Sequence, residues 1–245
     1  MLLSYDTLGP DTAPTLVFLH GLGASRTQST SSLPNLQNTR LIAPDMPGHG
    51  DSMGFDPTTY SFDTFADHVI ALMDHLGIAK THLGGISMGS GISLNIALRY
   101  PERVNKLILL RPSWLDSPEP AHLAFAAKPS WKSEAEFQAN PEFQALLRDN
   151  PPVAQSVLGL YDRPDNSVLE KMWRDCPFQS LASLGKITSP ALVLSTPRDE
   201  LHPQHVADQI AAHLTDVQTD ILPARYHEKE AYLNSLNTII NNFLK

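Results

Sequence analysis

The 245-residue chain has one cysteine, no long apolar run and fewer basic than acidic residues, and each shortage excludes or disfavours a class of protein. Cys176 has no second cysteine to pair with, which excludes an intramolecular disulfide framework. The apolar stretch 107–110 ends at once in Lys106 and Arg111, far short of the ~20 residues of a membrane-spanning helix. Basic residues number 18 against 26 acidic ones, and this net charge of −8 disfavours nucleic acids and anionic membranes as partners.

The amino-terminal residues, Met-Leu-Leu-Ser-Tyr-Asp, contain neither the basic segment nor the long apolar segment of a secretion signal. Together with the single cysteine, this predicts a cytoplasmic protein. Hydrophobic residues make up 42% of the chain, enough for a sizeable core without metals or disulfides. The length allows one large domain or two small ones.

Short apolar runs alternate with longer amphipathic segments in two parts of the chain, before residue 112 and after residue 190. Strands are expected at 15–20, 40–44, 81–87, 104–110, 191–195 and 217–222. Helices are expected at 62–76, with Ser61 as its N-cap, and at 88–100, 204–214 and 228–244. This alternation predicts an α/β fold with a mostly parallel central sheet and helices on both faces.

The intervening stretch has no comparable strand runs and contains all three tryptophans, Trp114, Trp131 and Trp173. We interpret it as short helices laid over the sheet edge where ligands bind in open α/β folds. The expected organisation is therefore a core domain made of residues 1–112 and 186–245, with a helical cap, residues 113–185, inserted into it.

The most informative motif is Gly-Ile-Ser-Met-Gly at 85–89, a G-x-S-x-G pattern between an expected strand and an expected helix. Glycines two residues either side of Ser87 permit a sharp turn, which would expose the serine hydroxyl at the carboxyl edge of the sheet. The alternative interpretation is a glycine-rich turn in which Ser87 merely caps the helix. The strand before and the helix after favour a nucleophile.

A serine nucleophile needs a histidine held by a carboxylate. His227 lies between the last expected strand and the last expected helix, at the same sheet edge as Ser87, and is the predicted base. Asp199 follows the strand 191–195 and is the predicted acid, with Glu200 and Asp116 as rivals. The resulting order of Ser, acid and His is that of one known class of catalytic triad.

These segments, with His-Gly-Leu-Gly at 20–23 and Asp-Met-Pro-Gly-His-Gly-Asp-Ser at 45–52, resemble the α/β-hydrolase fold superfamily over nearly the whole chain. Within it, the chain is most similar to small serine esterases and enol-lactonases. The resemblance implies a Ser-Asp-His triad without metal or cofactor. It also implies an oxyanion hole formed by the backbone N–H groups of Leu22 and Met88.

The sequence thus predicts a serine hydrolase that cleaves a small carboxylic ester, lactone or thioester through an acyl-enzyme. Arg111 and Trp114, just past a strand end, are the expected substrate contacts. His202 and His205 form a close pair without a third ligand, so no metal site is expected. A carbon–carbon bond hydrolase or perhydrolase using the same triad, and a non-catalytic ligand receptor, remain alternatives. The oligomeric state is left open.

Overall fold

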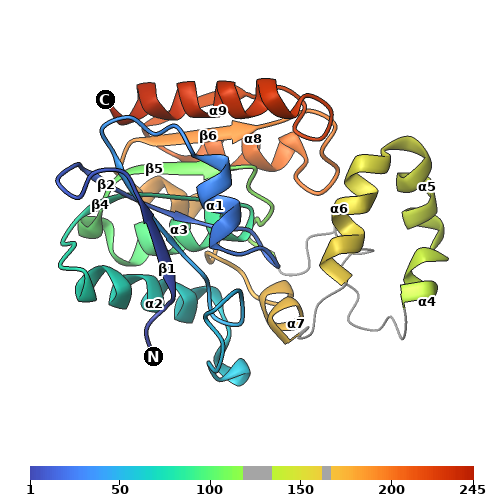
Figure 1. The fold of residues 1–245 in the computed structure, drawn as a ribbon, viewed down its shortest axis with the longest axis horizontal. Helices are drawn as coiled ribbons and strands as arrows, with labels where there is room; N and C mark the ends of the chain where they lie inside the picture. The colour runs from blue at the N-terminus through green and yellow to red at the C-terminus, as the bar shows by residue number, and fades with distance from the viewer. Residues whose placement is uncertain (118–133, 162–166) are drawn as a thin grey trace.

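The computed structural model describes residues 1–117, 134–161 and 167–245. They form a seven-stranded sheet with helices packed against it (Figure 1). The strand order is β1-β3-β2-β4-β5-β6-β7, and every neighbouring pair is parallel except β1 with β3. The strands are β1 (Tyr5–Leu8), β2 (Thr15–Leu19), β3 (Arg40–Pro44), β4 (Thr81–Ile86), β5 (Val104–Leu110), β6 (Ala191–Ser195) and β7 (Val217–Ile221). The predicted α/β fold with a mostly parallel sheet is confirmed.

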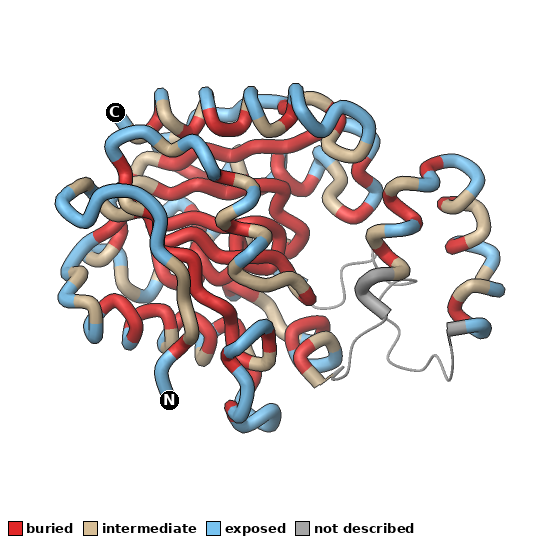
Figure 2. The backbone as a smooth tube through the Cα atoms, viewed as in Figure 1, coloured by how far each residue is buried: buried red, intermediate tan, exposed pale blue. Residues whose placement is uncertain are grey.

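The central strands are buried on both faces, as their continuous apolar runs predict (Figure 2). On one face lie α2 (Phe62–His75), α3 (Met88–Arg99) and α8 (Gln204–His213), whose apolar side chains form one core cluster with the sheet. On the other face lie α1 (Arg26–Ser32) and α9 (Lys229–Leu244). Ser61 is the N-cap of α2, as predicted, and accepts a hydrogen bond from the backbone N–H of Thr64.

Between β5 and β6, the regular elements in the described residues are helical. They are α4 (Glu134–Gln138), α5 (Pro141–Asp149), α6 (Pro151–Tyr161), α7 (Ser167–Trp173) and a 3₁₀ turn (Leu181–Lys186), and two further 3₁₀ turns lie at Pro57–Thr59 and Pro101–Arg103. Helices α4 to α6 stand apart from the sheet, beyond the carboxyl ends of its parallel strands. Trp131 lies outside the described residues.

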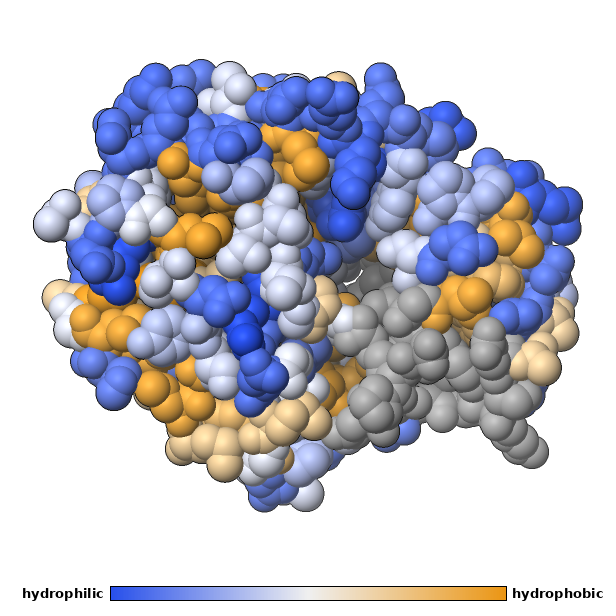
Figure 3. Space-filling model, viewed as in Figure 1, coloured by the Kyte–Doolittle hydropathy of each residue, from blue (hydrophilic) through white to orange (hydrophobic). Residues whose placement is uncertain are grey.

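Helices α4 to α6 have a small apolar cluster of their own, which includes Phe143 and Val153. The cluster also contains Leu201, from the loop after β6, and the half-buried Tyr226 packs against it. The space-filling view shows a hollow between the core and the lobe that these helices form (Figure 3). The helices are thus in contact with two loops at the carboxyl edge of the sheet. We keep the division into a core and a cap of residues 113–185 as a proposal.

In the residues that the structure describes, no helix combines the length and the apolar character that a membrane span requires.

Candidate active site

Ser87 occupies the turn between β4 and α3, with a φ of 54° and a ψ of −111°. Residues other than glycine rarely adopt this backbone conformation, and such strain is typical of functional positions. The Ser87 side chain does not cap α3, so the alternative of a capping serine is wrong. Within the described part of the chain, its hydroxyl has one hydrogen-bond partner, the Ser113 hydroxyl at 3.2 Å.

The two glycines of the motif are required by close packing of the backbone. A Cβ atom on Gly85 would lie 2.5 Å from the carbonyl carbon of Gly89. A Cβ atom on Gly89 would collide with the carbonyl oxygen of Leu19 at the end of β2. Because these positions carry no side chain, α3 approaches the sheet closely and Ser87 is held at the carboxyl edge.

The turn after β2 runs beside Ser87, and the buried His20 fixes its orientation. Nε2 of His20 accepts a hydrogen bond from the backbone N–H of Met46 at 2.9 Å, so this nitrogen carries the lone pair. The proton must then sit on Nδ1, which donates to the carbonyl oxygen of Gly21 at 2.8 Å. In a trans peptide the C=O and the following N–H point in opposite directions. His20 therefore turns the Leu22 N–H away from the imidazole.

The N–H groups of Leu22 and Met88 donate no hydrogen bond to any residue in the described ranges. The first is oriented by His20, and the second belongs to the opening turn of α3, where N–H groups lack helical partners. A Cβ atom on Gly21 would lie 3.5 Å from Ser87 Cβ, so the turn adjoins the nucleophile. Two unpaired donors beside a serine hydroxyl are suited to stabilising an oxyanion.

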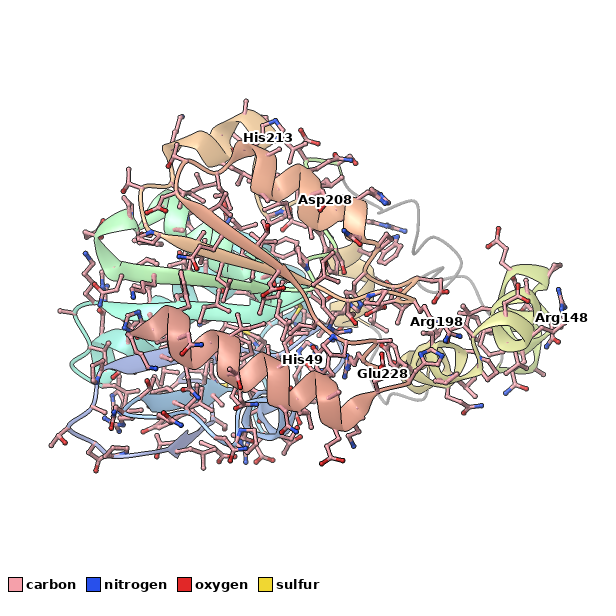
Figure 4. All side chains as sticks on the ribbon, turned by 90° about the horizontal axis from the view of Figure 1, so that it is seen from above. His49, Arg148, Arg198, Asp208, His213 and Glu228 are labelled. Atoms are coloured by element: carbon pink, nitrogen blue, oxygen red, sulfur yellow. The ribbon has the colours of Figure 1, made fainter. Side chains whose placement is uncertain are left out.

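A second buried histidine supports the same turn. Nε2 of His49 accepts from the N–H of Gly23 at 2.9 Å, and its Nδ1 lies 3.1 Å from the carbonyl oxygen of Pro47. The rings of His20 and His49 are 4.8 Å apart. In both histidines each ring nitrogen thus lies against a backbone group, which suits them for shaping the turn. Figure 4 labels His49 among the side chains at this end of the sheet.

The carboxylate of Asp199 is buried in the loop after β6. Its Oδ2 accepts a hydrogen bond from Nη1 of Arg111 at 2.7 Å, and Nδ1 of His202 lies 2.9 Å from both carboxylate oxygens. Burial alone would raise the pKa of Asp199, but the charges and hydrogen bonds of His202 and Arg111 outweigh it and hold the pKa well below its ordinary value. Asp199 is therefore ionised at neutral pH.

The structure does not join His227, the predicted base, to the predicted acid. His227 is exposed in the turn before α9, and its side chain makes no hydrogen bond within the described residues. The turn is closed by the carboxylate of Glu228, labelled in Figure 4, which accepts from the N–H of Ala224 at 3.1 Å. The imidazole that contacts Asp199 belongs to His202.

The two rival acids are engaged elsewhere. The carboxylate of Asp116 accepts from the N–H of Leu181 at 3.0 Å. The carboxylate of Glu200 accepts from the Asn150 side-chain amide at 2.7 Å. Neither contacts an imidazole among the described residues, whereas Asp199 does.

Arg111 and Trp114, the predicted substrate contacts, are 1% and 2% exposed. The guanidinium of Arg111 binds Asp199, and its Nε has no partner among the residues that the structure describes. The ring of Trp114 packs edge-on against Phe62 at a centroid distance of 5.6 Å. In the part of the chain that the structure describes, no cluster of three or more histidine, cysteine or acidic side chains is arranged to hold a metal ion. The roles of Arg111 and Trp114 toward a substrate stay predictions.

Comparisons with known proteins agree with the fold. The family model of the alpha/beta hydrolase fold matches residues 14–183. Lipase 3 of Moraxella sp. (strain TA144) is 25% identical over 231 residues, covering 86% of this chain and 68% of the lipase. The crystal structure of a hydrolase from Pseudomonas aeruginosa PA01 superposes with a TM-score of 0.78 at 23% identity, covering 99% of this chain and 94% of that one.

A 2-hydroxymuconate semialdehyde hydrolase of Pseudomonas sp. (strain CF600) is 36% identical over 107 residues, which are 42% of this chain. The chain spans only 38% of that relative. It is also 40% identical over 115 residues to the dihydrolipoyllysine-residue acetyltransferase component of the acetoin cleaving system of Pseudomonas putida, of which it spans 31%. The family match covers most of the present chain, from β2 through the helices that follow β5. The chain belongs to the alpha/beta hydrolase fold family.

Proposed function

We propose that the protein is a serine hydrolase that cleaves a small carboxylic ester, lactone or thioester through an acyl-enzyme. The observation that carries the proposal is the Ser87 hydroxyl. It lies in a strained turn beside the N–H groups of Leu22 and Met88, which have no hydrogen-bond partner in the described part of the chain. Acyl transfer needs a nucleophile next to donors aimed at the developing negative charge. No cofactor enters the proposal.

In the proposed reaction, the Ser87 oxygen attacks the carbonyl carbon while its proton passes to a histidine. The carbonyl oxygen becomes negatively charged and is stabilised by the two N–H groups, each worth about 3–4 kcal/mol of barrier. Collapse of this intermediate breaks the bond to the leaving alcohol or thiol, which takes the proton from the histidine. Water then attacks the acyl-enzyme in the same way and releases the carboxylic acid.

Asp199 holds the histidine in the proposal, because its carboxylate is buried, ionised and bonded to an imidazole. The sequence predicts His227 as that histidine. His227 is exposed, and among the described residues the side-chain partners of Asp199 are His202 and Arg111. The alternatives of a carbon–carbon bond hydrolase, a perhydrolase and a non-catalytic receptor use the same Ser87 environment.

The proposal is tested by measuring hydrolysis of p-nitrophenyl acetate and butyrate, aryl thioesters and small lactones by the wild type and by Ser87→Ala. We expect the wild type to hydrolyse at least one class and Ser87→Ala to lose activity by at least ~10³-fold. 2-Hydroxymuconate semialdehyde is included because one relative is named as its hydrolase. Equal rates for the two proteins would refute the proposal, and a folded wild type whose Ser87 resists a fluorophosphonate label would favour the receptor.

A further inference from the structure

Asn150 lies between α5 and α6, and its side chain reaches the loop that carries Asp199. Its Nδ2 donates to the carbonyl oxygen of Arg198 at 3.0 Å and to the carboxylate of Glu200 at 2.7 Å. Arg198 and Glu200 are the two neighbours of Asp199 in the chain. Asn150 is buried, so water competes little for these bonds. One amide group thus holds the loop on both sides of the predicted acid.

The start of α6 explains why this side chain is available to the loop. The carbonyl oxygen of Asn150 accepts from the N–H groups of Val153 and Ala154 at 3.1 Å, which makes Asn150 the N-cap of α6. A side chain at this position normally accepts a hydrogen bond from the first helical turn. Helix α6 begins with Pro151 and Pro152, which have no N–H to donate. Oδ1 of Asn150 accordingly has no partner among the described residues, and its Nδ2 faces the loop.

The asparagine that begins the preceding helix behaves differently. Asn140 is the N-cap of α5, and its Oδ1 accepts from the N–H groups of Glu142 at 2.8 Å and Phe143 at 3.2 Å. Its side chain makes no hydrogen bond to the core in the part of the chain that the structure describes. The contact with the loop is therefore particular to Asn150 and is not a general property of asparagine at a helix start.

The loop that Asn150 holds has a strained backbone. Arg198 has a φ of 57°, in the region that residues other than glycine rarely adopt, and such a conformation persists only when its surroundings hold it. Arg198, labelled in Figure 4, lies at the end of the core nearest the helices α4 to α6. Arg111 binds the Asp199 carboxylate directly, at 2.7 Å. The position of Asp199 is thus determined by Arg111 at its side chain and by Asn150 at its backbone.

Helix α6 also contacts the loop before α9. The hydroxyl of Tyr226 donates to the Ser156 hydroxyl at 3.4 Å, and the Tyr226 ring packs against the apolar cluster of α4 to α6. Tyr226 is the residue before His227, the predicted base. One helix therefore touches both loops that carry the predicted acid and the predicted base.

We infer that Asn150 is a positioning residue for Asp199: by holding Arg198 and Glu200, it fixes where the carboxylate is presented to the catalytic histidine. The inference rests on the proposed function, in which Asp199 is the acid. Asn150 itself takes no part in proton transfer. Because the contact is made from the junction of α5 and α6, alignment of the acid depends on how these two helices sit against the core.

The test compares kcat and KM on the best ester of the wild type for Asn150→Ala and for Asn140→Ala. Misplaced catalytic groups lower the rate even when the change lies away from the reacting atoms, so we expect kcat of Asn150→Ala to fall about 10-fold or more with KM within ~2-fold. Asn140→Ala is the matched control, since it removes an asparagine cap beside the same helix pair, and its kcat should not change. A wild-type kcat in Asn150→Ala, or an equal fall in both variants, would overturn the inference.

A double-mutant cycle separates positioning of Asp199 from general loosening. If Asn150 acts through Asp199, adding Asn150→Ala to Asp199→Asn should change kcat by less than ~2-fold. A further fall of about 10-fold in the double variant would show that Asn150 acts independently of the acid and would overturn the inference.

Urea unfolding checks that each variant folds. If Asn150→Ala does not fold, Glu200→Ala removes one acceptor from the exposed side of the same contact and takes its place in the cycle. Its kcat should fall about 3-fold or more, and a wild-type kcat would overturn the inference. These outcomes leave the proposed function standing as long as Ser87→Ala is inactive, whereas equal activity of Ser87→Ala and the wild type would make the proposed function itself fail.

Discussion

Replacing His20 with leucine removes the two hydrogen bonds that orient the turn beside Ser87. The substitution leaves the buried N–H of Met46 without its 2.9 Å acceptor and frees the carbonyl of Gly21 from its 2.8 Å donor. An unsatisfied buried N–H costs about 1–3 kcal/mol, so the free energy of unfolding should fall by that amount. The chain should still fold, because the Gly21 carbonyl keeps a second bond, from the N–H of Ala24 at 3.0 Å.

The catalytic effect follows from the Gly21–Leu22 peptide, whose orientation then depends on the hydrogen bond from Ala24 alone. Deleting one donor of an oxyanion hole typically lowers kcat by ~10²–10³-fold. In His20→Leu the Leu22 N–H is loosened and not removed, so we expect a smaller fall of about 10-fold with little change in KM. The assay is steady-state hydrolysis of the best ester, paired with urea unfolding of the same preparation.

A matched control is His82→Leu on the neighbouring strand β4. His82 is also buried, but its Nδ1 has no hydrogen-bond partner among the described residues, so kcat should change little. An unchanged kcat in a destabilised His20→Leu would refute the role of His20 in orienting the donor. An equal fall of kcat in both variants would show that general loosening of the core is responsible.

Three further predictions concern the strained turn, the close packing and the buried histidines. Ser87→Gly should be inactive but more stable than Ser87→Ala by about 1 kcal/mol in urea unfolding, since glycine adopts a φ of 54° without strain, and equal stabilities would contradict the strain. Gly89→Ala should lose about 1–3 kcal/mol and most ester hydrolysis, because its Cβ collides with the backbone of β2, and wild-type stability would show that α3 can shift freely. Burial lowers the pKa of His202 and His82, so the unfolded chain binds their protons more readily. The stability that the two neutral histidines contribute is complete above pH 6.5 and is lost as the pH falls below that value. The free energy of unfolding should then fall by up to about 1.4 kcal/mol per pH unit for each histidine, and a stability that rises toward pH 5 would contradict this.

The elements that could be predicted from sequence are those with apolar runs bounded by turn residues. Strand β3 begins and ends where it was expected, and α2 ends one residue early. Strand β1 was not predicted because its four residues, YDTL, are half-buried or exposed and show no apolar run. Helix α1 was not predicted either, since RTQSTSS has no helical periodicity and buries only Ser29.

In the candidate site too, the parts formed by neighbouring residues could be predicted, and the parts formed by distant residues could not. The Ser87 turn is encoded within five consecutive residues, and its strained geometry agrees with the motif. The pairing of Asp199 with Arg111 joins residues 88 positions apart, and no local pattern reports it. His202 was visible as a histidine three residues after the predicted acid, but its burial against that acid depends on how the loop packs. Single-sequence reasoning therefore finds the Ser87 turn more readily than the side chains that contact Asp199.

Leu201 belongs to the apolar cluster of α5 and α6, while its carbonyl oxygen receives the Ser113 hydrogen bond. One residue thus ties the helices that stand over the sheet edge to the loop that carries Asp199 and His202. A displacement of those helices would therefore be transmitted through the Leu201 carbonyl oxygen to Ser113, whose hydroxyl contacts Ser87.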